Sequence, residues 1–94
     1  MGVETLKVRV NKNWGQSPPK DKLPIAKIPL TAKVATVALS LAKKIKGDSK
    51  NSYQLMVNER NEILPQEMDV KDTVLKNFKD DEATVTLLPK LDAA

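Results

Sequence analysis

Residues 52–88 read SYQLMVNERNEILPQEMDVKDTVLKNFKDDEATVTLL, and this stretch carries most of the information about the architecture of the chain. Residues 53–57 alternate, which predicts a half-buried strand with Tyr53, Leu55 and Val57 on its inner face. A polar turn at 58–61 and a short strand at 62–64 are expected to follow. The stretch therefore begins as strand, turn and strand.

The remainder of the stretch predicts a short helix and a closing strand. Asp69 and Asp72 have the spacing of a capping box, with Asp in place of the usual returning Glu, and they predict a helical turn to about Phe78. Residues 79–82 form a charged loop. Residues 83–88 form the last strand, with Val85 and Leu87 inward.

An amphipathic helix precedes this stretch. Thr31 is the expected N-cap, the helix is expected over 32–46, and Gly47 is the expected stop. Its apolar side chains form one stripe at helical spacing: Val34, Val37, Ala38, Leu41 and Ile45. Lysines 43, 44 and 46 crowd the last turn, where cations complement the helix dipole, and this local role explains them without a partner.

Two strands are expected before the helix. Residues 4–10 alternate, with Leu6, Val8 and Val10 on one face. Residues 11–23 are polar and contain Gly15 and two prolines, which predicts a long loop. Residues 23–30 resume the alternation with Ala26, Ile28 and Leu30 inward, and the prolines at 24 and 29 indicate an edge strand.

This order predicts an α+β fold of the β-grasp type, with a mixed sheet of four or five strands packed on one central helix. The 94 residues are expected to form a single domain, residues 1–94, with an extended loop at 11–23 and a short tail at 90–94. Only one Trp, one Tyr and one Phe occur, so the core is expected to be aliphatic.

Composition argues against several functions. The chain has no Cys and no His, so it lacks disulfides, thiolate metal ligands and the commonest general base. It also has no glycine-rich phosphate loop, and we expect neither enzymatic activity nor a cofactor or metal. No apolar run approaches the roughly 20 residues that span a bilayer. We therefore expect no membrane span and a cytoplasmic protein, with a nuclear location left open.

Charge is divided unevenly along the chain. Residues 1–50 carry eleven Lys and Arg against three Asp and Glu, whereas residues 51–94 carry five against nine, and the net charge is +4. The basic half is expected either to attract an acidic partner or only to solubilise the protein.

From residue 28 to residue 88 the pattern resembles ubiquitin and its relatives. Residues 28–47 are similar to the second strand and central helix of that family, residues 53–57 to its third strand, Ile63 and Leu64 to its fourth, and residues 83–88 to its closing strand. Asp69 to Asp72 with Leu75 resembles the family's capped turn. The chain departs from the modifiers of the family because it ends in PKLDAA rather than Gly-Gly, which argues against conjugation and sulfur transfer. Its 11–23 loop is longer than ubiquitin's turn and resembles that of Ras-binding, Ras-associating and FERM-type domains.

The resemblance implies a protein-binding surface on the open face of the sheet. Its central apolar patch corresponds to Met56 and Leu88, with three basic side chains expected around them: Lys7, Arg60 and Lys90. The first hypothesis is therefore a non-covalent protein-protein interaction module that binds another protein through this face. The competing interpretation is that single exposed hydrophobic side chains are ordinary.

Two alternatives use the basic half. The first is a small-GTPase-associating domain that binds through the basic edge of the second strand, with Arg9, Lys27 and Lys33 as its candidate residues. Edge lysines that only discourage strand addition are the competing explanation. The second is a binder of nucleic acid or an anionic surface, which the scarcity of aromatic residues and arginine disfavours. Trp14 either pins the long loop to the sheet or serves as an exposed anchor. The chain is expected to be a monomer or a weak homodimer.

Overall fold

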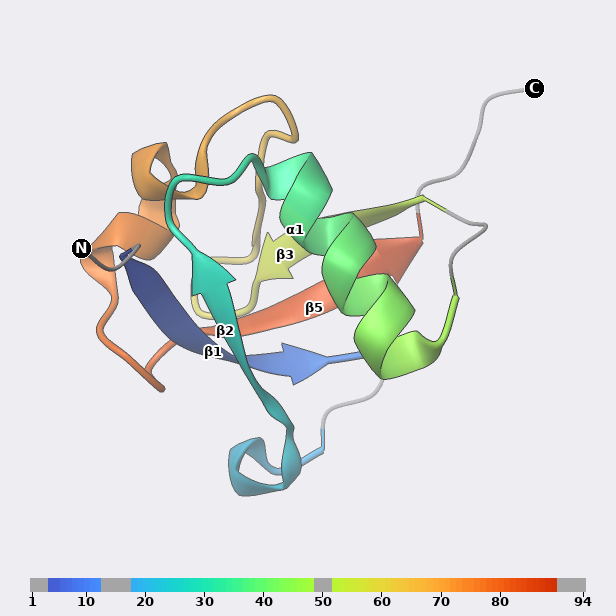
Figure 1. The fold of residues 1–94 in the computed structure, drawn as a ribbon. Helices are drawn as coiled ribbons and strands as arrows, with labels where there is room; N and C mark the ends of the chain where they lie inside the picture. Colours follow the sequence, from blue (N-terminus) through green and yellow to red (C-terminus); the bar gives the residue numbers. More distant parts are fainter. Residues whose placement is uncertain (1–3, 13–17, 49–51, 90–94) are drawn as a thin grey trace.

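The computed structural model describes residues 4–12, 18–48 and 52–89 (Figure 1). Its five strands are β1 (Thr5–Asn11), β2 (Ile25–Pro29), β3 (Tyr53–Val57), β4 (Glu62–Ile63) and β5 (Thr84–Pro89). The helix α1 (Val34–Leu41) continues into a π-helical turn, η2 (Ala42–Lys46). Three short 3-10 turns complete the described chain: η1 (Lys20–Lys22), η3 (Val70–Asp72) and η4 (Val74–Asn77). No helix within these residues is long and apolar enough to cross a membrane.

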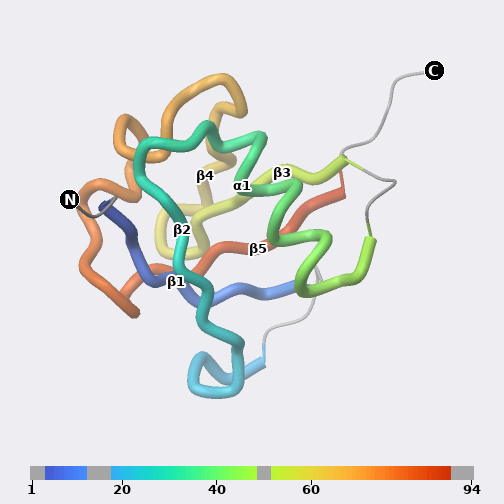
Figure 2. Tube along the Cα trace, in the orientation of Figure 1, coloured from blue at the N-terminus to red at the C-terminus, as the bar shows by residue number. Residues whose placement is uncertain are grey.

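The strands form one five-stranded mixed sheet in the order β2-β1-β5-β3-β4 (Figure 2). The central pair, β1 and β5, is parallel, with Arg9 opposite Thr84 and Val10 opposite Val85, and the other three pairs are antiparallel. The helix α1 crosses one face of this sheet (Figure 1). This arrangement confirms the predicted α+β fold of the β-grasp type.

The core lies between α1 and the sheet, and the period-two pattern of the strands builds it. The side chains predicted to face inward on β1, β3 and β5 are buried, and on α1 they meet Val34, Val37, Ala38 and Leu41, which are also buried. Ala26, Leu30 and Ile45 are partly buried against the same cluster. Burial of aliphatic surface, at about 25 cal/mol per Å² of apolar area, is therefore the main stabilising term for this domain.

The helix begins later than predicted, and Thr31 is not its N-cap. Lys33 is the N-cap, in an extended conformation, and no side chain caps the first turn. The amides of Val34 and Ala35 donate instead to the carbonyl oxygens of Met68 and Gln66, at 3.0 and 3.1 Å. Backbone carbonyls of a distant loop thus accept the hydrogen bonds that a capping side chain usually accepts from the first turn of a helix.

The helix ends where the sequence predicts. Gly47 has a φ of 68°, the left-handed conformation that closes many helices, and the amide of Asp48 donates to the carbonyl of Ala42 at 3.2 Å. The last five residues before Gly47 form a π-helical turn rather than an α-helical one. This wider turn carries Lys43, Lys44, Ile45 and Lys46.

The predicted capping box at Asp69 does not form. The Asp69 side chain makes no cap hydrogen bond and pairs with Lys33 at 3.7 Å instead. The segment to Phe78 contains two 3-10 turns rather than one helix, because the backbone is extended at Thr73. The Thr73 hydroxyl caps η4 by accepting from the amide of Leu75 at 3.2 Å, and it donates to the carbonyl of Val70 at 2.7 Å.

Replacement of Gly47 by alanine tests the helix terminus. An added Cβ would meet no atom within 4 Å, so the cost comes from the left-handed conformation and not from a clash. We expect Gly47→Ala to lower the free energy of unfolding by about 1 kcal/mol, measured by urea denaturation. Gly47→Asn is the control, with a smaller loss, because Asn tolerates this conformation better. Equal stability of wild type and Gly47→Ala would contradict the assigned terminus.

Candidate functional site

The two apolar residues predicted for the open face lie together on it. Met56 and Leu88 are half-buried and belong to the face opposite α1. Met56 is opposite Thr86, and Leu88 is opposite Gln54, so the two side chains are diagonal neighbours on adjacent strands. The structure therefore places Met56 and Leu88, the two apolar residues predicted for a binding surface, next to each other on the open face of the sheet.

Sequence reasoning missed a third apolar residue at this spot. Ile63 on β4 is opposite Met56 and is 48% exposed, whereas the next residue, Leu64, is buried. The predicted strand at 62–64 contained the signal, since alternation requires that only one of these two adjacent residues face the core. We call Met56, Ile63 and Leu88 the sheet patch.

The basic residues predicted around the sheet patch differ in their distance from it. Lys7 lies on β1, opposite Lys27 of β2. The β1 residue in register with Met56 is Asn11, because both are opposite Thr86. Lys7 is four residues from Asn11, which corresponds to about 13 Å along the strand. Arg60 is exposed in the turn between β3 and β4, beside the patch. Lys90 lies outside the described residues.

A polar network covers the part of the open face over β1 and β5. The guanidinium of Arg9 contacts the Asp81 carboxylate at 2.8 and 3.0 Å and donates to the carbonyl of Lys20 at 2.9 Å. The Lys20 ammonium donates in turn to the carbonyl of Glu82 and lies 3.7 Å from the carboxylate of Glu59.

Next to this network, two threonine side chains of β5, Thr84 and Thr86, are closed off from solvent. The Glu59 carboxylate accepts from the amide of Thr84 at 2.9 Å, and the Thr86 hydroxyl donates to Asn58 at 2.6 Å. Both threonines are buried although they lie on the face opposite α1. The face is thus a polar, covered surface at its centre, with the sheet patch confined to the side of β3 and β4.

The three residues predicted for the basic edge have different environments. The Arg9 side chain is only 16% exposed because it is held in the network. Lys33 pairs with Asp69 and donates to the carbonyl of Glu67 at 3.2 Å. Lys27 is exposed, and no residue in the described ranges forms an ion pair with it. Lys27 and Lys33 are both exposed, and of these two only Lys33 forms an ion pair with a described residue. Trp14 lies outside the described residues.

The strand β2 is an edge of the sheet, as predicted. The amide of Val10 donates to the carbonyl of Pro24, and the amide of Leu30 donates to the carbonyl of Glu4, so even-numbered residues of this segment bond to β1. Because bonding directions alternate along a strand, the N–H and C=O groups of Ile25 and Lys27 point to the outer side. This edge therefore offers two donors and two acceptors to another strand.

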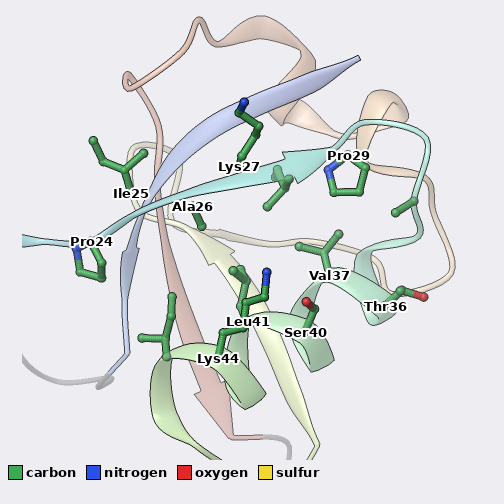
Figure 3. Close-up of a pocket in the computed structure, with 13 residues that line it drawn as sticks. Pro24, Ile25, Ala26, Lys27, Pro29, Thr36, Val37, Ser40, Leu41 and Lys44 are labelled. Carbon is green, nitrogen blue, oxygen red and sulfur yellow. The ribbon is translucent and has the colours of Figure 1, made fainter. Parts of the chain in front are cut away.

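A groove of about 380 Å³ runs beside this edge, between β2 and α1 (Figure 3). Buried side chains of both elements line its floor, Ile28 from β2 and Val37 and Leu41 from α1. Several of its other lining residues are small: Ala26 on β2, Thr36 and Ser40 on α1, and Ala32 before the helix. Small side chains leave the space between helix and strand unfilled. In Figure 3, Leu41 and Lys44 extend toward β2, whereas the side chains of Ile25 and Lys27 point away from α1.

A second hollow, of about 500 Å³, continues the groove past the start of β2. The two share Pro24, Lys44 and Ile45. The hollow is lined further by residues from the end of β1 and from the loop that follows: Val10, Asn11, Lys12, Pro18, Lys22 and Leu23. The long loop predicted from the sequence therefore builds one wall of a concave surface.

Lys46, next to this hollow, is held by the protein itself. Its ammonium donates to the carbonyl of Lys12 at 2.9 Å and lies 5.1 Å from the centre of the Tyr53 ring, a cation–π arrangement. The Tyr53 hydroxyl donates to the carboxylate of Asp48 at 2.8 Å. These contacts fasten the end of the helix to the sheet.

The groove and the hollow together form one concave surface with several kinds of chemical group. It provides backbone donors and acceptors, apolar side chains and lysine ammonium groups, which together suit an extended peptide. The chain matches no family model, and a search of the curated proteins finds no relative. The functional assignment therefore depends on the geometry of these surfaces.

The hydrogen bond between Tyr53 and Asp48 can be tested through the pKa of the Tyr53 hydroxyl. The carboxylate acceptor raises the pKa of Tyr53 above its ordinary value of 10.0, and partial burial and the negative charge of Asp48 act in the same direction. Because Tyr53 is the only tyrosine, an absorbance titration of tyrosinate reports on it alone. We expect Asp48→Ala to lower this pKa, and an unchanged value would contradict the contact.

The same contact makes stability depend on pH. The folded state holds the Tyr53 proton more tightly than the unfolded chain does. The corresponding stabilisation is therefore present below the ordinary pKa of tyrosine and is lost as the pH rises through the raised value. Urea denaturation across this range is expected to show a smaller alkaline loss for Asp48→Ala than for wild type.

Proposed function

We propose that this chain is a non-covalent protein-protein interaction module that binds an extended segment of another protein along β2. The segment adds a strand to the edge of the sheet and places apolar side chains in the groove between β2 and α1. The first hypothesis from the sequence, a protein-binding module, is retained, and the surface we favour is the edge rather than the open face.

One observation supports this proposal above the others: the outward backbone groups of Ile25 and Lys27 lie directly beside the groove. A strand that pairs with this edge gains up to four backbone hydrogen bonds. Its alternate side chains point toward the α1 side, where the groove receives them, because successive residues of a strand face opposite sides. Backbone pairing supplies affinity, and the groove supplies selectivity.

The charge of this edge favours a partner other than a second copy of the chain. Lys27 lies opposite Lys7 on β1, and like charges at such paired positions repel each other. Two such edges brought together would increase this repulsion, which is how edge lysines discourage self-association. A partner segment with acidic residues relieves it and is also attracted from a distance. An edge strand of an acidic small GTPase is one partner of this kind.

The sheet patch is the second candidate surface. It is favoured by the exposure of Ile63 beside Met56, since an exposed apolar cluster on a small domain often marks a contact site. The polar network next to it restricts the apolar area to the side of β3 and β4. We therefore rank it below the edge.

Substitutions on α1 distinguish the groove from the rest of the helix. Dodecapeptides selected from a random phage library on the immobilised protein serve as probes, with affinities from isothermal titration calorimetry. Ser40→Arg fills the groove, and we expect it to weaken binding at least about tenfold, or about 1.4 kcal/mol. Ala35→Arg is the matched control, because Ala35 is exposed on the same helix and does not line the groove. We expect the control to bind like wild type.

Met56→Asp separates the two candidate surfaces with the same probes. If Met56→Asp abolishes binding and Ser40→Arg leaves it unchanged, the sheet patch is the site and the proposal for the edge is wrong. If the two arginine variants weaken binding equally, the effect is general charge and the groove is not the site. Circular dichroism spectra of all three variants establish that each retains the fold.

A further inference from the structure

The hollow at the end of the groove has a different chemistry from the groove itself. Three lysines line it: Lys12 at the end of β1, Lys22 in η1 and Lys44 in the π-helical turn. No Asp or Glu is among the described lining residues, and the sequence from Lys12 to Lys20 contains none. Asp21 is the nearest carboxylate along the chain, and it is exposed on η1 outside the lining.

The ammonium groups of these three lysines are not neutralised within the described parts of the chain. The ion pairs there involve Arg9, Lys20 and Lys33. The ammonium of Lys46 contacts the carbonyl of Lys12 and the Tyr53 ring, whereas Lys12, Lys22 and Lys44 are exposed. Lysines that line a concave surface without an acidic residue in its lining create a positive potential, which attracts anionic groups.

The hollow and the groove are continuous, so one ligand can occupy both. They share Pro24, Lys44 and Ile45, and β2 runs from Ile25, beside the hollow, to Pro29 at the far end of the groove. A segment paired with β2 therefore has one end over the lysines. This arrangement differs from a general basic surface, because it fixes which end of the segment meets the charge.

We infer that the partner segment carries carboxylates at one end and that the Lys12, Lys22 and Lys44 hollow receives them. This inference rests on the proposed binding of a segment along β2. In the antiparallel arrangement, the more stable of the two, the C-terminal end of the segment lies beside Ile25. The partner motif is then an alternating apolar stretch followed by acidic residues.

Two synthetic peptides test the inference. Both contain an acetylated Val-Thr-Val-Thr-Val stretch, followed by three Glu in one and three Gln in the other. Each is titrated into labelled protein at low salt, and the amide shifts of Ile25, Lys27 and Thr36 report on the groove. We expect the Glu peptide to bind about tenfold more tightly than the Gln peptide, and this advantage to shrink at high salt as screening increases.

Charge variants of the protein locate the acidic end. Lys12→Gln/Lys22→Gln is expected to remove most of the advantage of the Glu peptide. The matched control is Lys71→Gln/Lys76→Gln, which makes the same change in net charge; the amide of Lys71 bonds to the carbonyl of Leu30, at the opposite end of the groove. The control is expected to keep the advantage.

Three other outcomes of these experiments would contradict the inference, and one of them would also contradict the proposed function. If both peptides shift the groove amides with equal affinity, the proposed function stands and the inference fails. If Lys71→Gln/Lys76→Gln removes the advantage of the Glu peptide and Lys12→Gln/Lys22→Gln does not, the acidic residues bind at the opposite end of the groove and the inference is wrong. If neither peptide shifts the groove amides at millimolar concentration, binding along β2 fails and the inference fails with it.

Discussion

The parallel pairing of β1 with β5 is the constraint on which the rest of this structure depends. It joins segments from opposite ends of the chain, with Val10 beside Val85, and it places their buried side chains at the centre of the core. A parallel pair requires a long connection, and here that connection contains β2, α1, β3 and β4. With the centre of the sheet occupied in this way, β2 and β4 become its two edges.

The two faces of the sheet consequently have different uses. One face is filled by α1. The other is closed at its centre by Arg9, Lys20 and Glu59, which tie three loops together over β5. Surface ion pairs of this kind add little stability each, but together with two hydrogen bonds they connect η1 to β1 and to the neighbouring loops. In this position of η1, Lys22 lines the hollow that ends the groove. The network that restricts the open face thus helps to shape the concave surface beside β2.

The sequence predicted the features that depend on local pattern. Alternation located the inner faces of the strands, helical spacing located the stripe on α1, and Gly47 marked the end of the helix. Contacts between distant segments were beyond such reasoning. The carbonyls of Met68 and Gln66 accept from the first turn of α1 in place of the expected Thr31 cap. Asp69 forms an ion pair with Lys33, and Arg9 contacts Asp81, which is 72 residues away in the sequence. The groove was missed for the same reason, since small residues on β2 and α1 form a hollow only after the two elements are brought together.

Hydrogen exchange at two amides tests the central claim most directly. Ile25 and Lys27 point their N–H groups away from the sheet, whereas those of Ala26 and Ile28 bond to β1. The account predicts that the amides of Ile25 and Lys27 exchange rapidly in the free protein and become protected when a selected peptide binds, while those of Ala26 and Ile28 stay protected throughout. Protection confined to the residues around Met56 and Ile63, with Ile25 and Lys27 still exchanging rapidly, would contradict it.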